Sequence, residues 1–322
     1  MLPTLRQLRY LKLLDDHRSF SRAAEAACVT QPTLSAGLQE LERTLGVRLV
    51  DRNRSGVILT AAGAEAAARA RTILAQAEDL SVAAKAAGAP LTGRFRLGVI
   101  PTIAPFLLPR ALPALRAEHP QLRLFLREDL TYRLIADLHD GGLDAAVIAL
   151  PYDLDGVDFA VVGEDELLAA VPEGHPLCAA ERVAPDRLLD DELILLEDGH
   201  CLRDQVLATC GLTTRRQGRD EPFAATSLST LVQMVGSGLG VSFLPSMAVE
   251  AGLAQIAPVA VRPLDAERAS RQIVVAWRSG SSRGSDGRLL AELFAKACGA
   301  ATGSAAVDQL PPGAQSISLR TR

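Results

Sequence analysis

The sequence predicts an all-α winged helix-turn-helix at the N-terminus, a long linker helix, and an α/β body of two lobes. Three observations predict this order. Up to about residue 45, apolar residues recur at helical spacing in short segments. An alanine-rich helical segment follows, and from residue 93 strand-like apolar runs alternate with helices. We therefore expect a head at 1–60, a linker helix at 61–88 and a body at 89–300.

Charge is distributed unevenly along the chain. The 322 residues carry a net charge of −4, which taken alone argues against binding to nucleic acid. Residues 1–54, however, hold nine Lys or Arg against six Asp or Glu, a net of +3, so the remainder carries −7. A basic head on an acidic body indicates that only the head meets DNA phosphates. A GC-rich genome would also favour arginine, so composition alone leaves that reading open.

Composition excludes several classes of protein. The first ten residues lack the apolar core of a signal peptide, and no segment reaches the ~18 apolar residues that span a bilayer. We therefore expect a cytoplasmic protein that does not contact membranes. The five cysteines are too few for a disulfide framework and lack zinc-site spacing, so we expect neither a metal nor a cofactor. These cysteines are Cys28, Cys178, Cys201, Cys210 and Cys298.

The head begins with two helices. Leucines recur at helical spacing over residues 4–16, which predicts the first helix. Ser19 or Ser21 is expected to cap an alanine-rich second helix at 22–27. A tight turn at 28–29 follows this short helix.

A third helix is expected at 31–45. Thr30 is its N-cap, Pro32 lies in the first turn, where a missing N–H costs nothing, and Gly46 follows its end. Two short helices joined by a tight turn match helix-turn-helix geometry. In that geometry the N-terminal residues of the second helix of the pair reach base edges in the major groove.

A basic hairpin is expected after the third helix. Two short strand-like runs, 48–50 and 57–59, flank a polar stretch that contains arginines. We interpret this hairpin as a wing whose arginines contact the DNA backbone. The residues expected to contact DNA are Ser21, Thr30, Gln31, Pro32, Thr33, Ser35, Gln39, Arg43, Arg52 and Arg54.

The linker helix predicts a dimer. Thr60 caps an alanine-rich helix that extends to about residue 87, and its apolar stripe consists of Ile73, Leu74, Ala77 and Leu80. Such a helix cannot bury its stripe alone, so we expect the same helix of a second subunit to cover it. A dimer would also allow one small head to recognise a two-fold DNA site.

The body follows a β-α-β pattern, which implies a parallel sheet in the first lobe. Strands are expected at 95–100, 122–126 and 145–150, with helices at 106–119 and 131–140 between them. A second lobe begins near 161–171 and 193–196, with a helix near 228–238 and a strand at 241–244. A strand at 272–277 and a helix at 288–298 return to the first lobe. Lobe I is thus about 93–162 and 268–300, lobe II is about 163–267, and the polar tail at 301–322 is expected to be disordered.

Two threonines lie where an α/β sheet usually places its ligand. Thr102 and Thr131 each follow a strand and precede a helix. Both would lie at the carboxyl ends of parallel strands, beside a cleft between the lobes. Taken alone, each of them is better explained as an ordinary helix N-cap.

Cys201 lies at a predicted helix start. Residues 193–196 are strand-like, Gly199 allows a turn, and 203–209 favour a helix. The positive end of a helix dipole stabilises a thiolate, and His200 and Arg203 would add cationic donors. A thiolate is the nucleophile that cleaves a peroxide O–O bond, so the position suits a peroxide sensor. A small buried hydrophobic residue is the alternative, as for most free cysteines.

Cys210 follows nine residues after Cys201. If the intervening segment is helical, the two Cα atoms are roughly 13 Å apart, whereas a disulfide needs about 7 Å or less. A disulfide between them would require this segment to unravel. Oxidation would then become a change of conformation.

Residues 1–60 resemble the LysR-type transcriptional regulators. The resemblance rests on Phe20, Ala23-Ala24, Gln31-Pro32-Thr33-Leu34-Ser35, Leu41-Glu42, Leu45-Gly46, Leu49 and Thr60-Ala61-Ala62-Gly63. It implies a DNA-binding head, a dimerising linker helix and a periplasmic-binding-protein-like regulatory body, usually in a tetramer. Promoter DNA is then the expected partner, and RNA polymerase is a further one.

Over most of residues 1–280 the chain resembles the peroxide-sensing members of that family. The matching segments are 197–205, Ile100-Pro101-Thr102, Leu107-Leu108-Pro109 and Ala225-Thr226-Ser227-Leu228, together with the Cys201/Cys210 spacing. The resemblance implies hydrogen peroxide as the signal, Cys201 as the peroxidatic residue and Cys210 as the resolving one. It also implies a peroxide pocket formed by Thr102, Thr131, His200, Arg203 and Asp204.

Three functions of different classes remain open at this point. The first is a peroxide-responsive transcription factor that is not an enzyme. The second is a LysR-type regulator that binds a small metabolite between its lobes, with structural cysteines. The third is a thiol peroxidase, against which the DNA-binding head argues.

Overall fold

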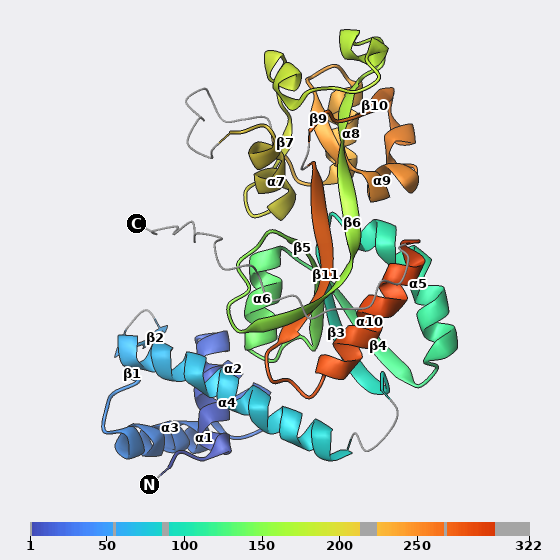
Figure 1. The fold of residues 1–322 in the computed structure, drawn as a ribbon. Helices are drawn as coiled ribbons and strands as arrows, with labels where there is room; N and C mark the ends of the chain where they lie inside the picture. Colours follow the sequence, from blue (N-terminus) through green and yellow to red (C-terminus); the bar gives the residue numbers. More distant parts are fainter. Residues whose placement is uncertain (1, 54–55, 86–89, 213–223, 267–268, 300–322) are drawn as a thin grey trace.

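The computed structural model describes residues 2–53, 56–85, 90–212, 224–266 and 269–299 (Figure 1). A helical head and its long helix form one end of the molecule. The α/β body, with its two lobes one above the other, forms the rest (Figure 1). The tail at 301–322, for which disorder was expected, lies outside the described residues.

The head contains the predicted helices. They are α1 (Leu5–His17), α2 (Phe20–Ala26) and α3 (Gln31–Leu45). Their apolar faces enclose one aliphatic core in which Leu11, Leu14, Leu34 and Leu41 are fully buried. This burial explains the leucine periodicity of the sequence.

Polar side chains begin these helices. Thr4 forms a capping box with Gln7 at the start of α1, and the Thr30 hydroxyl accepts from the Thr33 N–H at the start of α3. Ser19, not Ser21, caps α2, which therefore begins two residues earlier than predicted. Gly46 ends α3 in the left-handed conformation, as predicted.

The wing is displaced from its predicted position. Its strands are β1 (Val50–Asn53) and β2 (Gly56–Leu59), so the prediction of a first strand at 48–50 was wrong by about two residues. The cause is Glu42 of α3, whose carboxylate accepts the Leu49 N–H at 2.8 Å and the Val50 N–H at 3.2 Å. The end of the connection after α3 and the first residue of β1 are thereby tied to the helix.

The linker helix is α4 (Ala61–Lys85). The Thr60 hydroxyl accepts the Gly63 N–H at 2.9 Å, so the predicted N-cap is confirmed. Ile73 and Leu80 of the predicted apolar stripe are 43% and 72% exposed within one chain. Leu74 of the same stripe packs against the core of the head, and Ala77 is half-buried, so only part of the stripe is exposed for the predicted dimer contact. The predicted end of the helix, at 87, lies outside the described residues.

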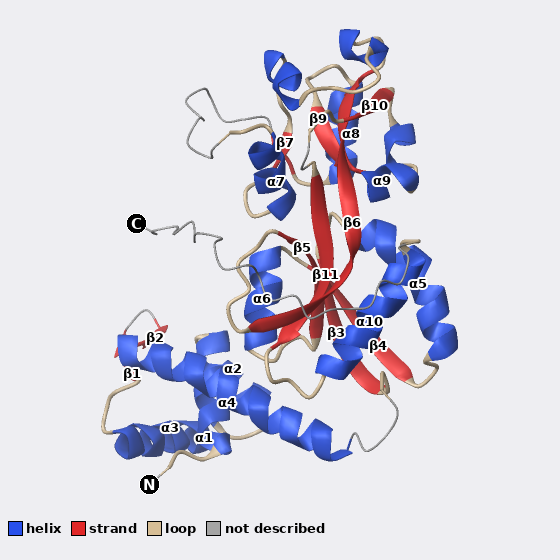
Figure 2. Ribbon diagram, viewed as in Figure 1, coloured by secondary structure: helices blue, strands red, loops and turns tan. Residues whose placement is uncertain are grey.

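Lobe I is built on parallel strands. β3 (Gly93–Val99) lies between β4 (Leu122–Glu128) and β5 (Ala145–Leu150), and both pairs are parallel. The crossover helices are α5 (Ala104–Glu118) and α6 (Thr131–His139), which lie on opposite sides of the sheet (Figure 2). The predicted β-α-β pattern is therefore confirmed here.

The sheet continues beyond β5 with antiparallel strands. β11 (Ser270–Arg278) pairs with β5, so the predicted return of the chain to lobe I is confirmed. Next to it, β6 (Val157–Pro172) runs through both lobes. Its first part pairs with β11, and its last part pairs with β10 (Val259–Pro263) and β9 (Ser242–Pro245). The lobes thus share one long strand, and α10 (Gly284–Ala297) packs against β6 and β11.

Lobe II also holds a small parallel pair, β7 (Leu195–Leu196) with β8 (Ala224–Ala225). Its helices are α7 (Cys201–Thr209), α8 (Leu228–Gly236) and α9 (Ser246–Glu250), and its short 3-10 helices are η1 (Pro176–Ala179), η2 (Pro185–Asp190) and η4 (Leu253–Ile256). In the described part of the chain, none of the helices has the length and apolar character needed to cross a bilayer.

Candidate functional site

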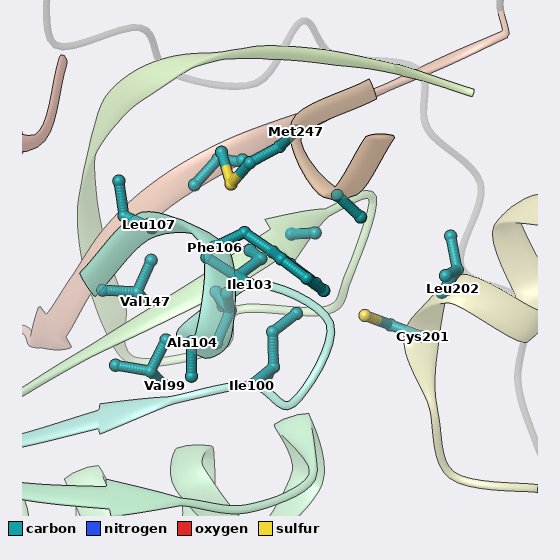
Figure 3. Close-up of a cluster of buried hydrophobic side chains, with 14 of the residues drawn as sticks. Val99, Ile100, Ile103, Ala104, Phe106, Leu107, Val147, Cys201, Leu202 and Met247 are labelled. Atoms are coloured by element: carbon teal, nitrogen blue, oxygen red, sulfur yellow. The ribbon is translucent and has the colours of Figure 1, made fainter. Parts of the chain in front are cut away.

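Cys201 is the first residue of α7 and faces lobe I. Gly199, in the preceding loop, has a φ of +96°, a conformation that favours glycine. A Cβ at this glycine would lie 3.1 Å from Leu130 at the start of α6, so the loop passes close to lobe I. The Cys201 side chain is buried, and its sulfur points from α7 toward the cluster that contains Ile100 and Ile103 (Figure 3). A loop that turns at Gly199 therefore places a thiol between the lobes.

Thr131 meets this thiol from lobe I. It is the first residue of α6 and is 1% exposed. Its hydroxyl has no hydrogen-bond partner of regular geometry, yet it lies close enough to the Cys201 sulfur to lower the pKa of that thiol by donating to the thiolate. A buried hydroxyl without a regular partner is costly to keep. It is suited to a thiolate or to a small polar molecule beside the thiol.

Thr102 belongs to a buried ionic network. Arg271 of β11 donates to the Thr102 hydroxyl at 2.8 Å and to the Thr102 carbonyl oxygen at 2.9 Å. The same guanidinium donates to Asp165 of β6 at 2.9 Å. Asp165 also accepts from the Ser246 hydroxyl and the Met247 N–H, each at 2.9 Å. The network therefore fixes a cation at the junction of the two lobes.

Burial raises the pKa of the Cys201 thiol, and three groups oppose that rise. They are the positive charge of Arg271, the Thr131 hydroxyl and the Leu202 N–H. The nearby cation is thus Arg271, which the sequence reasoning missed. We expected His200 and Arg203 to supply the positive charge beside Cys201. That expectation is corrected, because Arg271 supplies it.

His200 and Arg203 are both buried, and neither is among the groups that oppose the rise of the Cys201 pKa. Burial lowers the pKa of His200, which favours its neutral form. Arg203 donates to the Leu196 carbonyl oxygen at 3.0 Å, and its Nε lies 2.8 Å from Asp198 in an ion pair without hydrogen-bond alignment. Arg203 therefore joins α7 to β7. Asp204 is exposed on α7, and its charge raises the pKa of Cys201.

Cys210 lies at the far end of α7. The segment between the cysteines is helical, and the Cys210 N–H continues the helix by donating to the Val206 carbonyl oxygen at 3.0 Å. Nine residues at ~1.5 Å each separate the two Cα atoms by roughly 13 Å. Both thiols are free, and burial raises the pKa of Cys210 to about 11. The separation that the sequence predicted for a helical segment is therefore present.

Gln205 joins the site one helical turn after Cys201. It is buried, and its side-chain amide donates to the Leu150 carbonyl oxygen of lobe I at 3.3 Å, while its own oxygen has no partner. The spacing of four residues, which places it on the same face of α7 as Cys201, is the signal that could have identified it. Arg271 gave a signal too, because it is a charged residue at the start of an apolar strand.

The candidate DNA interface lies on the exposed face of α3. Ser21, Thr30, Gln31, Pro32, Thr33, Gln39 and Arg43 are exposed, and Ser35 is half-buried. The Ser21 hydroxyl donates to the Gln31 side chain at 3.0 Å, which fixes α2 against the start of α3. Arg43 pairs with Glu40 on the helix surface. Arg52 lies in β1 with its side chain outside the described part, and Arg54 lies outside the described residues.

Replacing Thr131 by valine should slow oxidation of Cys201 by peroxide roughly 10- to 100-fold, the value of one hydrogen bond to a charged group. The change should also raise the pKa of Cys201 further, moving the pH dependence of the rate upward. Stability should change little, because the hydroxyl has no regular partner to lose. Stopped-flow oxidation between pH 6 and 10 measures both effects. Thr131→Ser, which keeps the hydroxyl, should retain most of the rate; an equal loss in both variants would refute this role.

Family models match most of the chain. Residues 5–64 match the bacterial regulatory helix-turn-helix protein of the lysR family, and residues 88–299 match the LysR substrate binding domain. The two matches coincide with the head and the two-lobed body described above.

Individual relatives extend this similarity. A probable hydrogen peroxide-inducible genes activator of Mycobacterium avium is 40% identical over 91% of this chain and 93% of its own length. The transcriptional regulator EstR of Acinetobacter baylyi is 42% identical over 77% of this chain and 81% of its own. A full-length OxyR from Pseudomonas aeruginosa, solved with a cysteine-to-aspartate substitution, has a TM-score of 0.74 at 36% identity, over 91% of this chain and 95% of that one. The chain therefore belongs to the LysR family of helix-turn-helix transcriptional regulators.

Proposed function

We propose that this chain is a DNA-binding regulator that senses hydrogen peroxide through Cys201 and resolves the oxidised cysteine with Cys210. The observation that carries the proposal is the surroundings of the Cys201 sulfur. A buried thiol lies beside the Thr131 hydroxyl, which has no regular partner, and its pKa is lowered by the positive charge of Arg271, which contacts with Thr102 and Asp165 hold in place. Thr131 and Arg271 both belong to lobe I. The similarity to OxyR and to a peroxide-inducible genes activator supports the same conclusion.

The first chemical step forms a sulfenic acid. The Cys201 thiolate attacks one oxygen of hydrogen peroxide, the S–O bond forms and the O–O bond breaks. Sulfur is oxidised, and the departing hydroxide takes a proton to leave as water. Thr131 and Arg271 would stabilise the thiolate and the charge that moves onto the departing oxygen.

The second step forms a disulfide. The Cys210 thiolate attacks the Cys201 sulfur, the S–O bond breaks, and a second water leaves after protonation. Because α7 holds the two cysteines roughly 13 Å apart, its hydrogen bonds must open first. The Gln205 contact to lobe I would be lost with them. A local oxidation would thereby change how the lobes are joined.

The output of this switch would be promoter binding. Ser21, Thr30, Gln31, Pro32, Thr33, Ser35, Gln39, Arg43, Arg52 and Arg54 are the proposed DNA contacts. The exposed stripe of α4 would pair with the same helix of a second chain, in a homodimer or homotetramer.

RNA polymerase is a further proposed partner, and the cytoplasm, where promoter DNA lies, is the proposed location. We propose a regulator rather than an enzyme, so one chain should consume peroxide once per reduction.

Selection from random duplex DNA tests the function. Reduced and peroxide-treated protein are each used to enrich bound duplexes, and the affinities of both forms for the enriched sequence are compared. The proposal expects specific binding that changes between the two forms and returns after a dithiol reductant. A DNA affinity that is the same before and after peroxide treatment would contradict the proposal. It would favour a regulator of the same family with a metabolite as its signal. Sustained peroxide turnover would favour a thiol peroxidase.

Replacing Cys210 by serine should trap the intermediate. Cys201 should still react once with peroxide, but its sulfenic acid should persist because no thiol lies at the end of α7 to displace water. Trapping with a sulfenic-acid reagent followed by mass spectrometry measures the product. Cys298→Ser is the matched control, since Cys298 is also half-buried and lies on the C-terminal side of α10. A Cys210→Ser protein that shows no sulfenic acid at Cys201 would overturn the assigned roles.

A further inference from the structure

Arg71 of the linker helix contacts three carboxylates at once. Its Nη1 lies 2.7 Å from an oxygen of Asp15, and its Nη2 pairs with Asp16; both acids end α1 of the head. Its Nε lies 3.2 Å from Asp140, which caps the C-terminal end of α6 in lobe I. The Arg71 side chain is only 17% exposed. One guanidinium thus joins the head, the linker helix and the regulatory body.

A close backbone approach supports this junction. Gly141, with a φ of +69°, follows Asp140, and a Cβ built on it would lie 2.6 Å from the Ala75 Cβ. Ala75 is one turn beyond Arg71 on the same face of α4 and is 5% exposed. The C-terminal end of α6 therefore sits directly on the linker helix at two successive turns.

The other end of α6 is at the sensor. Thr131, its first residue, reaches the Cys201 sulfur, while Asp140 lies immediately after its last. Between them Leu134 and Leu138 are buried in the core of lobe I. Nine residues of helix, roughly 13 Å long, separate Thr131 beside the thiol from Asp140 beside the arginine. A shift of this helix at one end moves the other.

We propose that the contact between Arg71 and Asp140 is the coupling link that transmits oxidation of Cys201 to the DNA-binding head. When α7 opens, Thr131 loses its contact with the thiolate and α6 is free to shift, which would pull Asp140 from Arg71. The inference rests on the proposed function, because it assumes that Cys201 is the input. The contact between Arg71 and Asp140 is not part of the cysteine chemistry in that function.

The three contacts of Arg71 differ in a way that suits a switch. Asp140 is the most distant of the three acids and is 41% exposed, whereas Asp15 is 13% exposed. Burial raises the pKa of Asp140 although Arg71 opposes the rise, so its charge is held at a cost. Arg71 would keep Asp15 and Asp16 when Asp140 leaves. The head would then stay attached to the linker helix and separate only from the body.

Asp140→Asn tests the link at its weakest contact. Disulfide formation after peroxide should proceed as in the wild type, because Thr131 and both cysteines are untouched. The ratio of DNA affinities between reduced and oxidised protein, measured on the enriched duplex, should fall roughly 5-fold or more, the lower range of an allosteric coupling. Arg71→Met should give at least the same fall. Arg69→Met is the matched control, because among the described residues Arg69 pairs with Glu65 alone, on the surface of the same helix, and its replacement should leave the ratio unchanged.

A second readout does not depend on DNA or on peroxide. Hydrogen exchange of the reduced protein should be faster at the C-terminal end of α6 in Asp140→Asn than in the wild type, and unchanged in Arg69→Met. An Asp140→Asn protein with wild-type exchange and a wild-type affinity ratio would overturn the link. If the wild type itself forms no disulfide, the proposed function fails, and faster exchange would then support only the junction between α6 and α4.

Discussion

Replacing Cys201 by serine should abolish the peroxide response completely. DNA affinity, disulfide content and proteolytic pattern should be the same before and after treatment, because no other described cysteine combines burial with a hydroxyl that can donate to its thiolate and the stabilising charge of a buried guanidinium. A serine hydroxyl is not a nucleophile toward peroxide at neutral pH. The folded reduced state should be retained, since oxygen replaces sulfur without a change of shape.

The control for this experiment is Cys28→Ser. Cys28 is the exposed cysteine of the head, in the turn between α2 and α3, so a reagent reaches it freely. That variant should keep the whole response. A response that survives in Cys201→Ser and disappears in Cys28→Ser would locate the sensor in the head and would contradict the site described here.

Replacing Arg271 by methionine should destabilise the body by about 3–5 kcal/mol, because it leaves a buried carboxylate without its cation. Arg271 and Asp165 are 0% and 1% exposed, so water cannot compensate the charge. The Thr102 hydroxyl and carbonyl oxygen would lose their donors as well. Urea unfolding followed by the fluorescence of Trp277, the single tryptophan and a buried neighbour on β11, measures the loss.

The double variant Arg271→Met with Asp165→Asn separates two causes of this loss. The asparagine oxygen can still accept the Met247 N–H, and no uncompensated charge remains. Stability should therefore recover in part relative to Arg271→Met alone. If the double variant loses as much free energy of unfolding as the two single variants together, the ion pair is not the origin of the effect.

Much of the head could be predicted from sequence because its structure is locally determined. Each helix is specified by its own residues: leucines at helical spacing form the buried face, Thr4 and Thr30 begin helices, and Gly46 ends one. The bounds of α3 agree with the prediction. The position of the wing could be predicted less accurately. Its first strand begins at Val50, which together with Leu49 donates to Glu42, a contact across seven and eight residues that no local pattern shows.

The site could be predicted only in part. Cys201 and Thr131 were found because each begins a helix after a strand. Arg271 was missed because β11 reaches the site from residues far later in the chain, through antiparallel pairing with β5 and β6. The sequence predicts His200 and Arg203 as the cations instead, because they are close to Cys201 along the chain. In the structure, burial favours the neutral form of His200, and Arg203 donates to the Leu196 carbonyl oxygen.

Mass spectrometry of non-reduced peptides after mild peroxide treatment tests the central claim most directly. Reduced protein is treated with one equivalent of hydrogen peroxide, alkylated, digested without reductant and compared with an untreated sample. We predict one new crosslinked peptide pair that joins Cys201 to Cys210, with Cys28, Cys178 and Cys298 still alkylated. A treated protein in which Cys201 remains alkylated, or in which another cysteine takes its place in the crosslink, would contradict the account.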